Sequence, residues 1–386
     1  MSMTGSRASH APMRILLLTT GLKLGGAEQQ VAALARQFTT LGHTVAIVSL
    51  TEGCDVALPE SVDVLPLQMR KTPQSMALAL RQARIFIRSW RPDIIHAHMI
   101  HANLFARILG AISNTAPPVV CTAHSAREGG RLSMLAYRLT DRWSQLTTHV
   151  SPQGRQAMIA AGAVPARRIT VVPNGIDTTQ FRPDAAQRQR TRAELGLHAN
   201  TRLLINVGRL VKEKAQGPLI DAFSLVKPGL DARLLIVGEG PLRAALEQRI
   251  RNHQLTEHIH LLGARQDVPA LLNAADLFVL SSDIEGMPLA VGEALACELP
   301  VVATDASGVA ELLGECGEIV PRGNPDALAS AMRRALSAGR GSPDMKAARR
   351  ARIATNFSLT AVALKWLDCY AHLIKAKHAD VAEAPA

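Results

Sequence analysis

The chain has 386 residues, of which 47% are hydrophobic and 19% are charged, an ordinary composition for a globular protein. This length is large for a single hydrophobic core, so we expect two domains. The formal charge of +11 indicates acidic partners, such as a nucleotide or an anionic lipid. Nucleic acid is not expected among them, because only 3% of the residues are aromatic and they are not interleaved with the basic ones.

No apolar run reaches the length that a membrane-spanning helix needs. Residues 15–20 follow a polar segment and have the pattern of a strand rather than of a signal-peptide core, so we expect a cytoplasmic protein. The five cysteines are scattered without a C-x-x-C pair. This odd number argues for reduced thiols and against a structural zinc site.

Apolar runs of strand length alternate with helix-forming stretches along the chain. In the first half these runs occupy residues 14–20, 44–50, 93–98, 119–122 and 169–172. In the second half they occupy residues 203–207, 234–238, 259–263, 275–281 and 299–304. The alternation predicts an α/β protein with two Rossmann-like, doubly wound parallel sheets.

The same pattern divides the chain into segments. We expect a disordered tail (1–12), a first domain (13–181), an Arg-rich linker (182–200), a second domain (201–354), a C-terminal helix (355–376) and a second disordered tail (377–386).

Glycines and histidines mark the strand ends of the first domain. Gly25 and Gly26 lie in the loop after the first strand, where they allow a ligand to approach the backbone; a simple tight turn is the alternative. His96 and His98 alternate along a later strand without a cluster of carboxylates or cysteines, so we expect solvated or hydrogen-bonded histidines rather than a metal site. His124 follows the next strand, where open parallel sheets bind ligands.

Two stretches of the first domain combine arginines with helical spacing. One helical face carries Leu132, Leu135, Ala136, Leu139 and Trp143. Arginines at similar spacing are Arg131, Arg138 and Arg142, and earlier Arg81, Arg84 and Arg88. Two interpretations stay open: helices that pack on the core with a solvated basic rim, or helices that lie on an anionic membrane surface.

In the second domain, Arg209 and Lys214 lie on the loop after the first strand. Two cations on such a loop can meet one diphosphate and stabilise the negative charge that develops as it leaves. A charged surface loop is the alternative.

Glu285 and Glu293 lie on either side of a predicted helix start. Pro288 suits the first turn of a helix, so Glu285 should lie on the preceding loop and Glu293 one to two turns into the helix. The N–H groups of Leu289 and Ala290 at the helix N-terminus could then bind a phosphate, between two carboxylates that bind sugar hydroxyls.

The segment E-G-M-P-L-x-x-x-E at residues 285–293 resembles the E-x7-E motif of retaining glycosyltransferases of family 4, which have the GT-B fold. Further similar motifs follow the order of that family: G-G-A-E (25–28), T-x-H (122–124), V-P-N-G-I-D (172–177) and G-R-L-x-x-x-K (208–214). The resemblance covers about residues 13–376. It implies two domains that face each other across a cleft, and transfer of a sugar from a nucleotide diphosphate sugar to an acceptor hydroxyl with retention of configuration.

The resemblance also implies roles in donor binding. Arg209 and Lys214 would neutralise the diphosphate, together with the helix N-terminus at Leu289 and Ala290. Glu293 would bind the ribose hydroxyls. The turn that contains Arg265 corresponds to the place where the backbone reads the nucleotide base.

Other implied roles concern the transferred sugar. Glu285 would bind its hydroxyls, His124 would face it from the first domain and assist catalysis, and Gly25 and Gly26 would face donor and acceptor. The implied route is a front-face reaction, in which the leaving phosphate oxygen takes the acceptor's proton. No cofactor is expected, and no metal, consistent with the lack of a D-x-D motif.

A UDP-sugar is the expected donor, and a GDP-sugar used by a mannosyltransferase of the same fold is the alternative. A GT-B epimerase or phosphorylase is a further alternative. The charge and the basic helices favour a lipid-linked or cell-surface polysaccharide intermediate as the glycan acceptor, with peripheral contact to the anionic inner face of the membrane.

Overall fold

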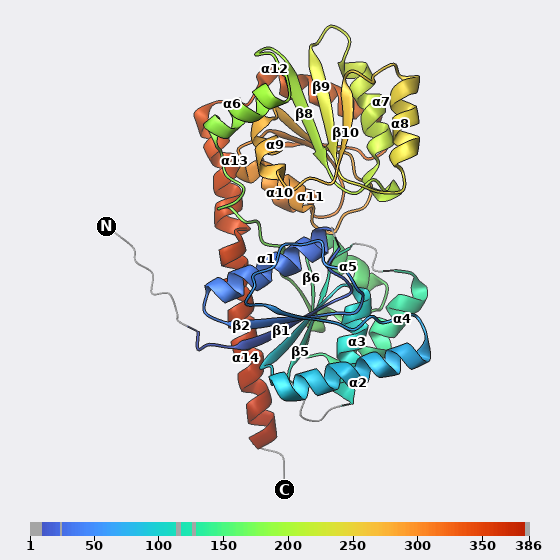
Figure 1. Cartoon of the computed structure of the whole chain (residues 1–386), viewed down its shortest axis with the longest axis vertical. Helices are drawn as coiled ribbons and strands as arrows, with labels where there is room; N and C mark the ends of the chain where they lie inside the picture. Colours follow the sequence, from blue (N-terminus) through green and yellow to red (C-terminus); the bar gives the residue numbers. More distant parts are fainter. Residues whose placement is uncertain (1–9, 24, 113–116, 126–128, 383–386) are drawn as a thin grey trace, which may run out of the picture.

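The computed structural model describes residues 10–23, 25–112, 117–125 and 129–382 (Figure 1). Two α/β domains follow each other along the longest axis of the molecule, and a long helical segment at the C-terminus connects them (Figure 1). The α/β class and the two parallel sheets predicted from the sequence are confirmed.

The N-terminal domain is built on a parallel sheet of seven strands in the order β3-β2-β1-β4-β5-β6-β7. Its strands are β1 (Arg14–Thr19), β2 (Thr44–Ser49), β3 (Asp63–Pro66), β4 (Ile94–His98), β5 (Val119–Ala123), β6 (Leu146–His149) and β7 (Ile169–Val171). Its helices are α1 (Gly26–Thr40), α2 (Pro73–Trp90), α3 (Ile100–Ala111), α4 (Arg131–Thr140) and α5 (Pro152–Ala160).

The C-terminal domain has a parallel sheet of six strands in the order β10-β9-β8-β11-β12-β13. The strands are β8 (Arg202–Val207), β9 (Ala232–Val237), β10 (Ile259–Gly263), β11 (Leu277–Leu280), β12 (Val301–Thr304) and β13 (Glu318–Val320). The helices around it are α6 (Ala185–Glu194), α7 (Gln216–Val226), α8 (Arg243–Asn252), α9 (Val268–Ala274), α10 (Leu289–Ala296), α11 (Val309–Leu313), α12 (Pro325–Ala338) and α13 (Pro343–Asn356).

Strand β1 is apolar at consecutive positions because both of its faces are buried. Ile15 and Leu17 point into the core shared with α1, whereas Leu16 and Leu18 point into the core on the other face of the sheet. All four side chains are fully buried, as expected for a central parallel strand covered by helices on both faces.

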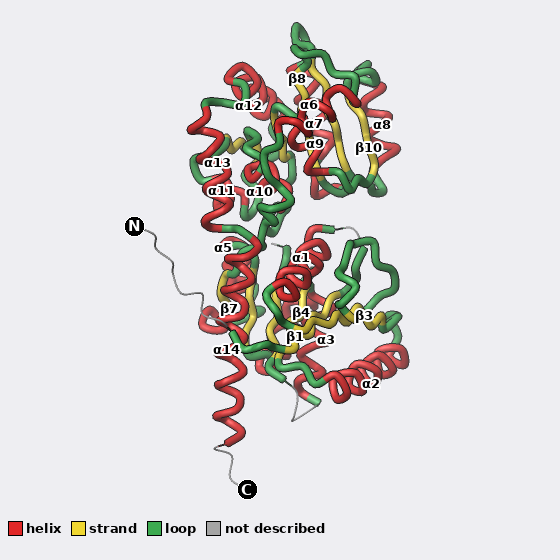
Figure 2. The backbone as a smooth tube through the Cα atoms, turned by 60° about the vertical axis from the view of Figure 1, so that its left-hand side comes forward, coloured by secondary structure: helices red, strands yellow, loops and turns green. Residues whose placement is uncertain are grey.

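The last helix, α14 (Leu359–Ala382), returns to the N-terminal domain. It runs down one side of the N-terminal domain (Figure 2) and packs against α1, and its Trp366 and Tyr370 are buried in the same core as Phe38. The disordered tail expected from residue 377 is wrong as far as Ala382, because the helix continues that far. The expected tail at 1–12 lies mostly outside the described residues, but the His10 ring contacts Asp368 on α14 at 2.9 Å.

The segment expected to be a linker, residues 182–200, holds α6, which packs against α9. Arg188 and Arg192 of this helix donate hydrogen bonds to the buried carboxylate of Asp276, at 2.5 and 3.2 Å. These bonds fasten the segment to the C-terminal sheet.

Candidate active site

The loops that follow strands β5 and β11 meet where the two domains face each other. Gly286 lies so close to the N-terminal domain that a Cβ atom there would be 1.9 Å from the backbone oxygen of His124. Only glycine fits such an approach. The structure therefore brings the Glu285 loop of one domain onto the His124 loop of the other.

Glu285 and Lys214 form an ion pair. The Lys214 Nζ lies 2.6 Å from Glu285 Oε1, and the Glu285 side chain is only 7% exposed. Two further bonds hold the loops together: Ser281 Oγ donates to the Lys214 carbonyl, and the Asp283 N–H donates to the Glu213 carbonyl. The sequence indicated a separate ligand contact for each of the two side chains, and it did not predict that they pair directly.

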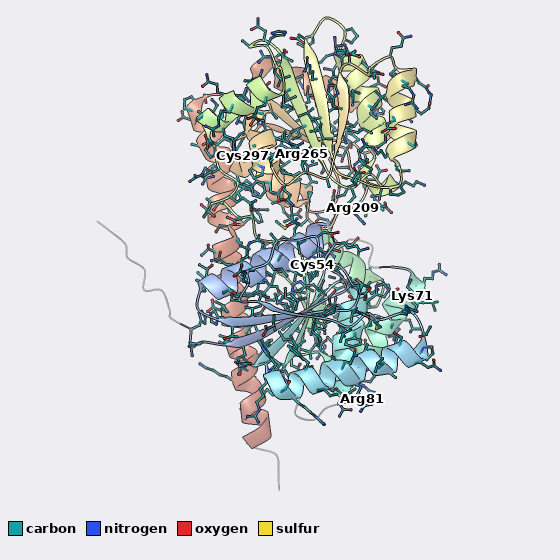
Figure 3. The ribbon with its side chains drawn as sticks, viewed as in Figure 1. Cys54, Lys71, Arg81, Arg209, Arg265 and Cys297 are labelled. Carbon is teal, nitrogen blue, oxygen red and sulfur yellow. The ribbon has the colours of Figure 1, made fainter. Side chains whose placement is uncertain are left out.

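Arg209 lies on the exposed loop after β8, at the edge of the C-terminal domain that faces the N-terminal domain (Figure 3). Its positive charge acts across the domains on Glu28, in the first turn of α1. Burial raises the pKa of the Glu28 carboxyl, while the hydrogen bond from its own backbone and the positive charge of Arg209 act against this rise. A partly buried carboxyl and an exposed guanidinium thus lie on facing edges of the two domains.

Gly25 and Gly26 open helix α1 beside these charges. Gly25 is the extended N-cap residue, and the Glu28 carboxylate folds over it so closely that a Cβ at Gly25 would lie 2.3 Å from Glu28 Oε2. A Cβ at Gly26 would lie 3.8 Å from the Leu289 side chain of the other domain. The glycine loop therefore touches the start of α10.

Helix α10 begins at Leu289, as predicted, after the extended residue Pro288. None of the described side chains caps its N-terminus, so the first N–H groups, at Leu289 and Ala290, are placed to bind an anion. Glu293 is on the second turn and partly buried, and burial raises the pKa of its carboxyl to about 7.

Arg265 is set apart from these residues. It lies on the turn after β10, where its guanidinium donates two hydrogen bonds to the exposed Asp267 carboxylate, at 2.8 and 2.7 Å. No contact with the other predicted site residues is found among the described part of the chain. Its side chain is thus occupied locally, which leaves only the backbone of this turn for a ligand.

His124 follows β5 and takes part in a group of histidines. Its Nε2 lies 3.0 Å from Nδ1 of His98, and burial, together with the nearby His149, lowers the pKa of His124 to about 3. His96 and His98 are buried and hydrogen-bonded. The expectation of hydrogen-bonded histidines is therefore confirmed for both, and that of solvated ones is wrong.

Two features of this histidine group were not predicted from the sequence: His149 and the pairing of His98 with His124. His149 ends β6, a strand hidden in the sequence because its residues, L-T-T-H, directly follow a helical pattern of apolar residues. The sequence did contain a signal that His96 and His98 are neighbours. Residues two apart on a strand point to the same face, and the centroids of these two rings lie 4.0 Å apart.

Two family models match the chain, Glycosyltransferase Family 4 over residues 24–180 and Glycosyl transferases group 1 over residues 201–338. The UDP-Gal:alpha-D-GlcNAc-diphosphoundecaprenol alpha-1,3-galactosyltransferase of Escherichia coli is 31% identical over 231 residues, 56% of this chain and 58% of that protein. One component of the human phosphatidylinositol N-acetylglucosaminyltransferase is 30% identical over 323 residues, 76% of this chain and 61% of that protein. The matches thus span less than two thirds of either relative.

Among solved structures, Anabaena HepE in complex with UDP-glucose is similar with a TM-score of 0.80 at 22% identity, over 94% of this chain and 100% of that one. The fold is therefore the GT-B fold of glycosyltransferases. The two family models match consecutive parts of the chain, and the chain therefore belongs to glycosyltransferase family 4. The resemblance seen in the sequence is confirmed.

Proposed function

We propose that this protein transfers a sugar from a nucleotide diphosphate sugar, with UDP as the preferred nucleotide, to an acceptor hydroxyl. The observation that carries the proposal is the Lys214–Glu285 ion pair at the domain interface, beside the uncapped N-terminus of α10. Cations and N–H groups there suit a diphosphate, and carboxylates suit sugar hydroxyls. The names of the Escherichia coli relative and of the HepE complex support UDP.

In this proposal, donor binding rearranges the ion pair. The diphosphate competes with Glu285 for Lys214 and is also met by Arg209 and the N–H groups of α10. Glu285 is thereby freed to accept hydrogen bonds from the sugar, while Glu293 accepts them from the ribose. No metal or other cofactor is needed, because the protein itself supplies the positive charge.

We further propose that the transfer retains the configuration of the sugar. The bond from the anomeric carbon to the leaving phosphate oxygen breaks, the acceptor oxygen bonds to the same face, and the leaving oxygen takes the acceptor's proton. A pKa of about 3 makes His124 a weak base that stays neutral at physiological pH, so in this proposal it serves as a hydrogen-bonding group while the leaving phosphate oxygen takes the proton.

Calorimetric titration with UDP, GDP and ADP in EDTA tests the donor site. We expect one nucleotide, UDP, to bind, and Lys214→Ala and Glu293→Ala each to weaken binding at least tenfold, about 1.4 kcal/mol. Lys212→Ala, in the same turn as Lys214, is the control and should bind normally. Absence of binding to any nucleotide by the intact protein would contradict the proposed activity. A preference for GDP would mean that the donor is a GDP-sugar instead of a UDP-sugar.

A lipid-linked acceptor is proposed from the surface of α4. Leu132, Leu135 and Leu139 are 83%, 49% and 65% exposed, so this apolar face does not pack on the core. A groove of about 460 Å³ beside it is lined by Arg131 and Arg138, among others. Exposed leucines next to arginines suit an anionic lipid surface. The names of both relatives include a lipid.

Binding to vesicles tests this surface. No helix in the described ranges is long and apolar enough to span a membrane, so binding should be peripheral and reversible. We expect co-sedimentation with phosphatidylglycerol vesicles, weakened by salt and abolished in Leu132→Ser/Leu139→Ser. Leu225→Ser, at an exposed leucine of the C-terminal domain, is the matched control. Equal binding to neutral phosphatidylcholine vesicles, or none to either, would contradict the membrane contact.

A further inference from the structure

The backbone that leads to Glu285 lies outside the sheet of the C-terminal domain. Strand β11 ends at Leu280, which is paired with Ala303 of β12. Ser281 and Ser282 follow and are only 2% and 1% exposed, so their backbone groups depend on partners within the protein. The bonds that hold this segment therefore come from other parts of the domain.

Thr304, the last residue of β12, supplies one of these bonds. Its Oγ1 lies 2.6 Å from the carbonyl oxygen of Ser282, and Thr304 is only 3% exposed. A carbonyl oxygen can only accept a hydrogen bond, so the Thr304 hydroxyl is the donor. Because a buried carbonyl that loses its donor is costly, this bond is a strong restraint on the segment.

The loop after β12 also meets the segment on the other side of Glu285. A Cβ atom at Gly308 would lie 2.4 Å from the carbonyl oxygen of Gly286 and 2.9 Å from the Cα of Met287. Only glycine allows this approach, and the φ of +77° at Gly308 favours glycine as well. The loop between β12 and α11 thus contacts the backbone both before and after Glu285.

Arg322, which follows β13, holds the next carbonyl. Its Nη1 donates to the Asp283 carbonyl at 2.9 Å, while its Nε and its backbone N–H donate to the Asp305 carboxylate at 2.9 and 3.0 Å. The Arg322 side chain is half exposed, so its bond restrains the segment less than that of Thr304. The two residues hold consecutive carbonyls shortly before Glu285.

We propose that Thr304, assisted by Arg322, is a positioning residue that fixes Glu285 for the transferred sugar. This inference rests on the proposed function, in which the donor diphosphate takes Lys214 away from Glu285. Once that ion pair opens, the Glu285 side chain loses the partner that holds it at 2.6 Å. The hold on its backbone remains, and it limits where the carboxylate can go.

Hydrogen–deuterium exchange tests this hold without any activity. The Asp283 N–H donates to the Glu213 carbonyl at 2.8 Å, and such amides exchange faster when their segment loosens. We expect at least about tenfold faster exchange in the peptide that contains Asp283 in Thr304→Val, which keeps the side-chain shape and removes the donor. Thr201→Val is the matched control, because its buried hydroxyl also donates at 2.6 Å, to a carboxylate at the opposite edge of the same sheet. Unchanged exchange in Thr304→Val would overturn the proposal.

A kinetic cycle with Glu285 tests the consequence for the donor. Release of UDP from UDP-glucose, UDP-galactose and UDP-N-acetylglucosamine is measured for Thr304→Val, Glu285→Gln and the double variant. We expect Thr304→Val to lower turnover at least about tenfold with UDP affinity within about twofold of the wild type, and to add little in the Glu285→Gln background. Thr304→Ser restores the hydroxyl and should restore most of the turnover.

A second variant, Arg322→Met, decides the question if Thr304→Val does not fold. It removes a guanidinium from an exposed place, so we expect the same pattern with a smaller loss of turnover, about twofold to fivefold. Arg334→Met, which breaks an exposed ion pair with Glu318 in the same domain, is its control and should leave turnover unchanged.

Equal losses by Thr304→Val in the wild-type and Glu285→Gln backgrounds would show a merely structural role and overturn the proposal. A matching loss of UDP affinity, or failure of Thr304→Ser to restore turnover, would also overturn it. If the intact protein releases no UDP and binds none, the proposed function fails. The exchange experiment would still decide whether Thr304 holds the segment, so the two failures are distinguishable.

Discussion

Glu293 is only partly ionised in the free protein at neutral pH, because burial raises the pKa of its carboxyl to about 7 from 4.5. A raised pKa means that the folded protein holds this proton more tightly than the unfolded chain. The resulting stabilisation is complete below about pH 4.5 and is lost as pH rises through about 7. A donor whose ribose hydroxyls bind this carboxyl would offset part of the loss.

We expect Glu293→Gln to be more stable than the wild type at pH 8 and similar to it at pH 5. Reduced for the partial exposure of the side chain, the difference at pH 8 should be about 1–2 kcal/mol. Urea unfolding of both proteins across this pH range measures it. A constant difference between pH 5 and pH 8 would contradict the raised pKa.

Helix α6 shows at the scale of an element how a polar, Arg-rich stretch becomes ordered. Asp276 accepts hydrogen bonds from Arg188, Arg192 and the backbone N–H of Leu203, and so joins α6 to β8. Because Asp276 is 7% exposed, its removal leaves charged donors that lack their acceptor in a buried place.

Asp276→Ala should therefore lower the free energy of unfolding by about 2–3 kcal/mol. Asp267→Ala breaks an exposed pair with Arg265 and should cost about 0–1 kcal/mol. Chemical unfolding of the two variants beside the wild type makes the comparison. Equal losses would mean that α6 is not held through Asp276.

The elements that the sequence predicted well are those with long apolar runs. Strand β10 and helix α10 have the expected bounds, because apolar residues dominate the strand, although it lies at a sheet edge, and Pro288 marks the start of the helix. Strand β3 (D-V-L-P) was missed because it lies at the sheet edge and is mostly exposed. The helical face expected through Trp143 is divided into α4 and a turn at Asp141–Trp143, because β6 begins at Leu146.

The sequence indicated candidate site residues, but it did not indicate the contacts between them. Lys214 and Glu285 are 71 positions apart, and no local pattern says that they meet. The same holds for His98 and His124, which meet because β4 and β5 are neighbours in the sheet. Such contacts follow from strand order and from the approach of the two domains.

On the scale of the whole molecule, glycines and polar side chains are among the residues through which the two domains touch. Ser151 contacts Ser307 at 3.1 Å, and Gln153 donates to Glu311 at 2.6 Å. With Gly286 against His124, these contacts set how closely the two facing edges approach. These contacts therefore set the width of any site that residues of both domains form together.

Gly286→Ala should push the domains apart, because the added methyl group meets backbone that cannot turn away. We expect a larger radius of gyration in X-ray scattering and at least a tenfold loss of donor turnover. Gly130→Ala is the control, since a Cβ there would have no neighbour within 4 Å among the residues that the structure describes. Unchanged scattering and turnover would show that the domains need not approach this closely.

The path of α14 has a consequence for synthesis of the protein on the ribosome. The N-terminal domain is made first, yet Trp366 and Tyr370 complete its core beside Phe38. Its apolar surface along α1 thus stays uncovered until almost the entire chain has been translated. A nascent chain that stalls within the C-terminal domain would expose that surface, which makes this half of the molecule a natural client for chaperones that bind growing chains.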